Sequence, residues 1–331
     1  MGDPGGVGPE IAIKSSEYLV KKHGQIKPVI FGSFEHIENI AKKIIKTKTP
    51  LNLIRPELSL ESSYKKEEIN IIDLSLKSYN HVKLGYNNPE YAKDVESYIK
   101  TAVDFSVAAK ICGFATAPIN KDMMLQGGAK FGGHTEFLGH LTDSKDFVML
   151  FYSKKIITVL ATIHIPLSKV HNMITKDLLT KIINISINWI KVDLGKKNPR
   201  IAVLGLNPHA GENGRIGNEE KTIILPVIKE FQEKNEKIEG PFPADSFFAK
   251  KYKDFDLIVS MYHDQALIPF KFLAFNKGVN VTAGLKIIRT SPVHGTAYDI
   301  AGKNTADFGS MVESIELVHR ISENRNKWKE K

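Results

Sequence analysis

Residues 200–211, RIAVLGLNPHAG, carry an apolar, β-prone run that ends in a proline, a histidine and a glycine. Two other segments follow the same plan, residues 155–166 (KIITVLATIHIP) and residues 256–265 (DLIVSMYHDQ). Each apolar run has the length of a strand, and each is followed by residues that turn the chain. The three segments therefore predict three strands, each with a histidine at or just beyond its C-terminal end.

Strand-like and helix-like runs alternate along the rest of the chain. Further strands are predicted at residues 27–33, 69–75 and 113–119, and helices at 96–111, 176–191, 219–231 and 310–325. This alternation predicts an α/β fold with a largely parallel or mixed sheet. The polar stretch 47–66, which contains Pro50 and Pro56, predicts irregular surface structure.

The bulk composition is that of an ordinary globular protein. The chain has 331 residues, 42% hydrophobic and 25% charged, enough for two lobes with a core each. It shows no apolar run near the ~20 residues of a membrane span and no signal-peptide pattern. The single cysteine, Cys112, cannot form an internal disulfide. We therefore expect a cytoplasmic protein that does not bind membranes.

The formal charge of +9 comes mainly from lysines that lie beside acidic residues, as in YKKEE and NRNKWKEK. Such scattered lysines are typical of a solvated surface. A nucleic-acid-binding protein would more often cluster arginine and interleave aromatic residues. The sequence therefore argues against a nucleic acid as partner and leaves an anionic small molecule open.

The histidines that follow the three strands are His164, His209 and His263. Each alone is compatible with a structural hydrogen bond at a strand end. Ligands of open α/β sheets bind at the carboxyl ends of the strands, so three imidazoles in the same position favour a metal site. Three neutral imidazoles with an open position are typical of catalytic zinc and suit cobalt, nickel or manganese better than magnesium. Asp264 would orient an imidazole, or would serve as a turn residue.

The N-terminal stretch GDPGGVGPE combines four glycines with the start of an apolar-periodic run. Pro9 suits the first turn of a helix, and Glu10 suits its positive end. The stretch therefore predicts a glycine loop that leads into a helix. Such a loop is either a tight surface turn or, with Gly5 and Gly8, a cradle for a polar cofactor.

Two more groups of residues have the chemistry of a ligand site. In FGGHTEFLGH, Gly132 and Gly133 precede His134 and Thr135, which either cap a helix or approach a small ligand. In the segment 268–292, three side chains bring a cation, an amide and a guanidinium together in the sequence. These are Lys271, Asn280 and Arg289. Such groups recognise phosphate and carboxylate.

Taken in order, these motifs resemble the 4-hydroxythreonine-4-phosphate dehydrogenases of pyridoxine biosynthesis. The resemblance covers nearly the whole chain and rests on GDPGGVGPEI, TAPINKDMM, GHTEFL, LATIHIPL, LGLNPHAGENGRIGNEE, PADSFF, MYHDQALIPFK and GVNVTAGLKIIRTSPVHGTAYDIAGKNTAD. More loosely, the first and last blocks resemble loops of the isocitrate and isopropylmalate dehydrogenases. This implies a two-lobed fold of that kind, with a central mixed sheet and an active site in the interlobe cleft.

The resemblance implies roles for individual residues. His164, His209 and His263 would bind a divalent metal, in a site shared between the subunits of a homodimer. The phosphorylated substrate would contact His134, Thr135, Lys271, Asn280 and Arg289. The cofactor would lie along Gly5, Gly8, His294, Gly295, Thr296, Asp299 and Asn304. The sequence has no arginine pair placed for a 2′-phosphate, which favours NAD over NADP.

The implied reaction is the oxidation of a secondary alcohol to a ketone, after which a β-keto acid loses carbon dioxide. Lys121, Lys271 and Asp264 are the candidates for the group that removes the hydroxyl proton. A metal would lower the pKa of the hydroxyl and stabilise the enolate of decarboxylation. The sequence does not distinguish zinc, cobalt, manganese and magnesium.

The resemblance also implies an organisation of the chain. Residues 1–112 and 285–331 would form a cofactor-side lobe, and residues 113–284 a lobe for metal, substrate and dimerisation. Related chains carry a short apolar strand before the glycine loop, whereas Met1 stands at their internal methionine. We therefore expect a late-assigned start rather than a chain without this strand.

The sequence is compatible with two other kinds of function. A dehydrogenase of the same family could act on erythronate or threonate 4-phosphate, or on a cyclic diol carboxylate, because it would share the metal and cofactor residues. A non-catalytic metal- or nucleotide-binding protein would be expected to lack a ligand or a substrate cation, and every expected position is filled.

Overall fold

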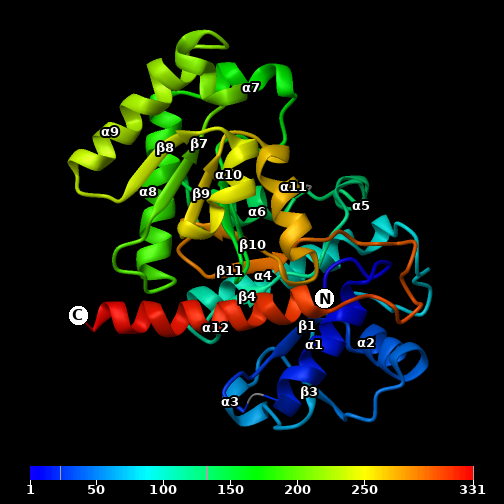
Figure 1. Cartoon of the computed structure of the whole chain (residues 1–331). Coiled ribbons are helices and arrows are strands. Elements are labelled where there is room, and N and C mark those ends of the chain that lie inside the picture. Colours follow the sequence, from blue (N-terminus) through cyan, green and yellow to red (C-terminus); the bar gives the residue numbers. More distant parts are fainter. Residues whose placement is uncertain (23, 132, 331) are drawn as a thin grey trace. The chain divides into compact units, whose positions relative to one another are not determined.

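The computed structural model describes residues 1–22, 24–131 and 133–330, and these form two compact units (Figure 1). Unit 1 comprises Met1–Ser144 and Lys286–His319, and unit 2 comprises Lys145–Leu285 and the residues from Arg320 onward. The division differs from the expected one in residues 113–144, which belong to unit 1, and in Leu285 and the residues from Arg320 onward, which belong to unit 2. The strand in residues 113–144 pairs within unit 1, and the helices of this segment pack on a helix of the same unit.

Unit 1 contains two sets of parallel strands. Its elements are α1 (Gly8–Lys22), β1 (Val29–Gly32), α2 (Phe34–Ile40), β2 (Leu51–Ile54), α3 (Leu60–Ser63), β3 (Ile69–Asp73), α4 (Ala92–Val107), β4 (Phe114–Ala115), α5 (Lys121–Gln126), α6 (His134–Leu141) and β11 (Arg289–Pro292). The order of the three-stranded sheet is β1-β3-β2, and β4 pairs with β11. Isoleucines of α1, α2, β1 and β3 form one core cluster of this unit.

The strand β2 lies within residues 47–66, for which the sequence predicted irregular structure, so that prediction was wrong. Asn52 in β2 is buried, and its side chain donates to Asn70 Oδ1 (2.8 Å) in the neighbouring strand and to Ser63 O (2.8 Å). Because both amides are satisfied inside the sheet, a strand forms where the residue types suggest a loop.

Unit 2 is built on a mixed sheet of six strands. Its elements are β5 (Val148–Tyr152), β6 (Ile157–Leu160), α7 (Leu167–Met173), α8 (Lys176–Val192), β7 (Ile201–Leu204), α9 (Leu225–Glu233), β8 (Ile238–Phe242), α10 (Ala244–Lys250), β9 (Leu257–Ser260), α11 (His263–Ala274) and β10 (Val279–Ala283). Their order is β10-β5-β6-β9-β7-β8; the first two pairings are antiparallel and the other three parallel. The expected α/β fold with a mixed sheet is confirmed.

Helices cover the sheet of unit 2. Helix α8 contacts β5, β9 and β10, while α11 contacts β6 and β9, and Figure 1 shows strands between the two helices. A last helix, α12 (Gly309–Lys329), begins in unit 1 and ends in unit 2. In its second part Arg325 pairs with the buried Asp193 (2.7 Å), which follows α8. This contact holds the C-terminal residues to unit 2.

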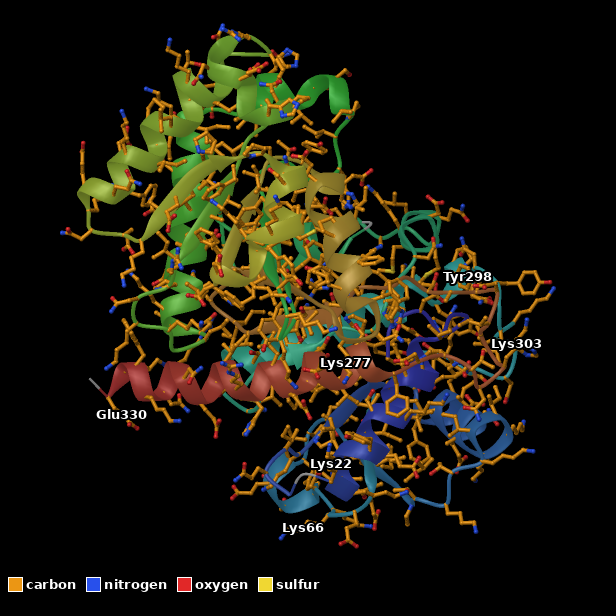
Figure 2. All side chains as sticks on the ribbon, viewed as in Figure 1. Lys22, Lys66, Lys277, Tyr298, Lys303 and Glu330 are labelled. Carbon is orange, nitrogen blue, oxygen red and sulfur yellow. The ribbon has the colours of Figure 1, made fainter. Side chains whose placement is uncertain are left out.

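Within the described ranges, no helix has both the length and the apolarity to cross a membrane. The lysines labelled in Figure 2, Lys22, Lys66, Lys277 and Lys303, are all exposed and lie in different segments. Their separation agrees with the solvated surface that the sequence indicated.

Candidate active site

The three predicted metal-binding histidines follow three neighbouring strands of unit 2. Strand β9 lies between β6 and β7, and all three run parallel, so their carboxyl ends share one edge of the sheet. His164 follows β6, His263 follows β9 and His209 follows β7. The topology therefore places the three histidines after the carboxyl ends of three neighbouring parallel strands.

Two of these histidines lie side by side. The ring centroids of His164 and His263 are 5.8 Å apart. His263 opens α11, and its Nδ1 contacts Asp264 Oδ1 at 2.7 Å. A carboxylate on Nδ1 fixes the ring and leaves Nε2 to face a ligand.

His209 is not brought to this pair. Among the described residues, no three His, Cys, Asp or Glu side chains gather closely enough to hold a metal. His209 is exposed and lies in the 3-10 segment η3 (Pro208–Gly214). The pair and the third histidine therefore do not form a closed ligand set within one chain.

The backbone of η3 follows a left-handed path. His209, Ala210, Gly211, Glu212 and Asn213 all have φ between 43° and 75°. Left-handed conformations cost L-residues about 1–2 kcal/mol each, so surrounding contacts must impose this path.

Buried polar contacts support this segment. The carboxylate of Glu220 accepts hydrogen bonds from the Asn207 backbone N–H (2.7 Å) and from Asn207 Nδ2 (3.0 Å). Glu219 accepts another hydrogen bond from Asn207 Nδ2 at 2.8 Å. The acidic pair in NPHAGENGRIGNEE thus holds Asn207, two residues before the left-handed path begins at His209.

Gln265 joins two of the strand ends and was missed by the sequence analysis. Its Nε2 donates to Gly205 O (2.7 Å) after β7, and its Oε1 accepts from Met261 N–H (2.7 Å) after β9. Gln265 is 9% exposed, and its motif position beside His263 and Asp264 was the only sequence signal for such a role.

Two predicted substrate residues also belong to unit 2. Lys271 lies in α11 and is exposed. Asn280 lies in β10, and its buried Oδ1 has no hydrogen-bond partner within the described residues. A buried carbonyl oxygen without a donor is costly, so a ligand that donates a hydrogen bond would suit Asn280.

The other predicted substrate residues lie in unit 1. His134 and Thr135 begin α6, whereas Gly132 lies outside the described residues. Desolvation, with the charges of Arg289 and the Met1 amine, holds the pKa of His134 well below its usual value. His134 is therefore a neutral imidazole at pH 7.

Arg289 is the first residue of β11 and is 4% exposed. Its guanidinium donates to Thr116 Oγ1 through Nε (3.2 Å) and Nη2 (2.7 Å). Burial lowers the pKa of Arg289 to about 10, so it remains a cation at neutral pH. A fixed, largely desolvated guanidinium next to a neutral imidazole is well suited to an anion.

The glycine loop leads into α1 at Gly8, as predicted, and residues 2–10 are all buried. A Cβ on Gly6 would lie 2.8 Å from Thr296 O, so the loop needs glycine where it meets the loop of residues 293–304. Gly5 and Gly8 are likewise enclosed by protein atoms. Their observed role is close packing, and cofactor contact by them stays a prediction.

The loop 293–304 has features of a ligand surface. His294 Nδ1 contacts Gly295 O (3.1 Å), while its buried Nε2 has no partner within the described part of the chain. A Cβ on Gly295 would meet open space. Asp299 and Asn304 are exposed in the same loop, as is Lys121 at the start of α5. Space and an unsatisfied ring nitrogen thus occur together at His294.

Comparison with known proteins identifies the family. The model of the family described as pyridoxal phosphate biosynthetic protein PdxA matches residues 24–318. The chain belongs to this family. A PdxA-family relative from Sulfurihydrogenibium sp. strain YO3AOP1, named 4-hydroxythreonine-4-phosphate dehydrogenase, is 41% identical over 96% of this chain and 95% of its own length. The resemblance inferred from the motifs is confirmed, and the family is one of oxidoreductases.

Two further PdxA-family comparisons bear on fold and substrate. The crystal structure of 4-hydroxythreonine-4-phosphate dehydrogenase from Klebsiella pneumoniae superposes with a TM-score of 0.85 at 35% identity, covering 97% of this chain and 96% of that one. A relative from Oceanobacillus iheyensis, 38% identical over 95% of this chain and 94% of its own, is named as a candidate D-threonate 4-phosphate dehydrogenase.

Proposed function

We propose that the chain is an NAD-dependent, divalent-metal-dependent 4-hydroxythreonine-4-phosphate dehydrogenase. It would oxidise 4-phosphohydroxy-L-threonine to a 2-amino-3-keto acid phosphate, which loses carbon dioxide to give 3-amino-2-oxopropyl phosphate, a step towards pyridoxal 5′-phosphate. The observation that carries the proposal is the full-length similarity to dehydrogenases of that name. The cytoplasmic location is part of the same proposal.

The donor set at the edge of the unit 2 sheet fits a divalent metal. Imidazole nitrogen is a favoured ligand of zinc and cobalt, and Asp264 orients His263 in the manner of carboxylate–histidine pairs at metal sites. We assign His164, His209 and His263 as ligands. A bound metal would act as a Lewis acid towards the substrate hydroxyl and the later enolate.

The loop 293–304 fits a dinucleotide. The unsatisfied Nε2 of His294 offers a hydrogen-bonding position, and Gly295 leaves room for a ligand. We assign His294, Gly295, Thr296, Asp299 and Asn304 to the cofactor. NAD supplies the hydride acceptor.

The remaining residues would bind the substrate and move its proton. Arg289 and Lys271 would hold the charged ends, while neutral His134, Thr135 and Asn280 would supply uncharged hydrogen-bonding groups. During oxidation the C–H bond gives its hydride to the cofactor and the O–H bond gives its proton to a base. Lys121, Lys271 and Asp264 are the candidates for that base.

A homodimer is part of the proposal, because the histidines do not form a closed set in one chain. Helix α11 and the residues after it expose large apolar side chains, Ile268 (68%), Phe272 (91%) and Phe275 (53%). The four-residue spacing of Ile268 and Phe272 places these two side chains on one side of α11, and Phe275 follows in the 3-10 segment η6 (Phe275–Lys277). Lys271 lies within the same segment. We propose that a second copy covers this face and that the metal site is shared between the subunits.

Substrate oxidation can be followed at the absorbance of the reduced nicotinamide. NAD and NADP would each be offered with 4-phosphohydroxythreonine, 4-phosphoerythronate or 4-phosphothreonate. We expect NADH from 4-phosphohydroxythreonine, loss of at least 90% of the rate (about tenfold) after chelation, and recovery on adding zinc, cobalt or manganese. Turnover that survives complete metal removal would contradict the metal assignment.

A second candidate substrate is D-threonate 4-phosphate, favoured by the name of the Oceanobacillus relative. This substrate lacks the amino group and would use the same metal and cofactor residues. If 4-phosphothreonate were the only one of the three phosphates turned over, the protein would be assigned as a threonate 4-phosphate dehydrogenase. No turnover of any of the three phosphates, together with no binding of nicotinamide cofactor, would overturn the dehydrogenase proposal.

A further inference from the structure

One face of α1 and of the loop before it holds the loop 293–304. The contacting residues are Asp3, Val7, Glu10 and Lys14, which are spaced by four, three and four positions. Glu10 and Lys14 lie four residues apart on one side of α1, while Asp3 and Val7 belong to the loop before it. Figure 2 labels Tyr298 and Lys303 on the loop that they hold.

Each of the four residues makes a defined contact. Val7 N–H donates to Thr296 O (2.9 Å), and the hydroxyl of Tyr298 donates to Asp3 Oδ2. Lys14 Nζ donates to Asn304 O (3.0 Å) and to Ala306 O (3.3 Å). The four residues therefore contact the loop from Thr296 to its C-terminal end.

Glu10 makes the most demanding of these contacts. Its Oε1 accepts from Gly302 N–H (2.6 Å) and its Oε2 from Asn304 N–H (3.1 Å). Glu10 is only 1% exposed, so its carboxylate depends on these donors and on nearby Lys14 in place of water. Both carboxylate oxygens are used to hold two backbone groups of one turn.

The loop needs such external support. Ala297 (φ 45°), Gly302 (φ 82°) and Asn304 (φ 59°) have left-handed backbones, and two of them are not glycine. Left-handed L-residues are unfavourable without contacts that impose them. Glu10 holds two of the three at their backbone N–H groups, so it fixes the turn in a conformation that the loop alone would not favour.

The same loop carries the assigned cofactor residues His294, Gly295, Thr296, Asp299 and Asn304. We propose that Glu10 is a positioning residue that keeps this loop in the shape that receives the nicotinamide dinucleotide. The inference rests on the proposed function. It adds a residue that does not touch the cofactor but sets its affinity, because a preformed loop binds without the cost of ordering.

The test compares Glu10→Gln with Glu17→Gln. Glutamine at position 10 keeps one acceptor oxygen and turns an NH₂ donor towards a backbone N–H. Glu17 lies in the same helix and binds Thr47, Thr49 and Lys21 instead of the loop. We expect Glu10→Gln to raise the KM and the Kd for NAD about tenfold, with kcat within about twofold of the wild type. Hydrogen exchange of the peptide containing Gly302 and Asn304 should accelerate in Glu10→Gln. Glu17→Gln should change neither the affinity for NAD nor this exchange rate.

A second variant covers the case in which Glu10→Gln does not fold. Lys14→Gln removes the donor to Asn304 O and Ala306 O but leaves Glu10 in place, and it should raise the Kd for NAD about threefold. Faster exchange of the loop with unchanged NAD affinity would overturn the positioning role, leaving a purely structural contact. If the wild type binds NAD and neither variant weakens binding, this inference falls while the dehydrogenase proposal stands. If the wild type binds no NAD, both fall.

Discussion

His36 is a buried histidine whose proton balance affects stability. It lies in α2 and is 3% exposed, and its Nε2 contacts Pro4 O at 2.9 Å in the glycine loop. Burial lowers the pKa of His36 to about 4, against weaker opposing effects of Pro4 O and Glu35. The folded protein therefore keeps this ring neutral under conditions in which the unfolded chain protonates it.

The sign of the pH effect follows from this difference. Above the unfolded pKa of about 6.5 both states are neutral, and His36 adds no pH dependence. As the pH falls from about 6.5 to 4, the unfolded chain binds the proton and the folded chain does not, so stability is lost. Between pH 7 and 5 we expect His36 to account for a loss of about 2 kcal/mol in the free energy of unfolding.

Urea unfolding of the wild type and of His36→Gln at the two pH values measures this contribution. The variant is less stable at pH 7 and should lose less stability on acidification. His81→Gln, at an exposed position, should retain the wild-type pH dependence. Equal losses in the wild type and in His36→Gln would show that protonation of His36 is not linked to unfolding.

For single residues, the sequence indicated the candidate metal-binding histidines but not the residues whose hydrogen bonds hold the surrounding loops in place. The imidazoles of His164 and His263 follow apolar runs, so strand topology alone predicted their common edge. Gln265 and Glu10 act through backbone groups distant in the sequence, and Asp3 acts through the hydroxyl of Tyr298. No spacing rule shows such partners, because the fold creates them.

Among the elements, η3 contains a left-handed run, residues 209–213, in which Gly211 is the glycine. Gly211 has φ +75°, and a Cβ there would lie 2.5 Å from Glu220 Oε2 and 3.1 Å from Gly217 O. Glu220 is held by Asn207 and has little freedom to move. We expect Gly211→Ala to lower the free energy of unfolding by about 2 kcal/mol and to weaken metal retention.

Ala210 is the matched control, because it has φ 50° in the same segment and already carries a Cβ. Ala210→Gly relieves left-handed strain in the folded state but increases the conformational entropy of the unfolded chain. The two effects oppose each other, so the free energy of unfolding should change by less than about 1 kcal/mol. Denaturant unfolding and metal content after dialysis compare the two variants. If Gly211→Ala changed neither the free energy of unfolding nor the metal content, the backbone of this segment would have a different conformation in solution.

The exposed face of α11 makes a separate prediction. Phe272→Glu places a charge where the second copy would pack, so it should shift the protein to a monomer in light-scattering chromatography and reduce turnover at least tenfold. Leu76→Glu, at a position 68% exposed in unit 1, should leave both properties unchanged. A dimeric and active Phe272→Glu would exclude this face as the interface.

Sequence patterns predicted elements well where side chains followed their usual preferences. The apolar periodicity of residues 176–191 corresponds to α8, and the run at 69–75 contains β3. They failed at β2, where Asn52 is buried in the sheet against Asn70. Residue types indicate which conformations are favourable on average, whereas a specific buried partner decides individual cases.

For the whole molecule, motif order was a stronger guide than composition. Composition excluded few functions, whereas blocks from the glycine loop to Asp307 matched one family in sequence order, and the comparisons agree over nearly the full length. Such order reflects a complete set of residues that only a whole fold brings together. The division into units lay outside what the motifs contained, since pairing of β4 with β11 sets it.

Unit 1 contains a large pocket whose wall is mainly apolar, and filling it should change the stability of the fold. The pocket, of about 600 Å³ and partly open to solvent, is lined by residues of α1, β1, α4, β4, α6 and α12, including Ala102 and His134. Apolar side-chain atoms placed in such a pocket leave water, which is favourable. Ala102→Leu adds three carbon atoms on the pocket wall, so it should raise the free energy of unfolding by about 1–2 kcal/mol.

Ala92→Leu is the control within the same helix, because Ala92 is fully buried and does not line the pocket. Its Cβ closely approaches the backbone at Gly127, so a larger side chain should overpack and cost about 1–3 kcal/mol. Opposite signs in urea unfolding would show that the space beside Ala102 is available to a side chain. Equal destabilisation by both variants would mean that the pocket beside Ala102 is filled in solution. A larger side chain increases stability only where there is space to bury its apolar atoms.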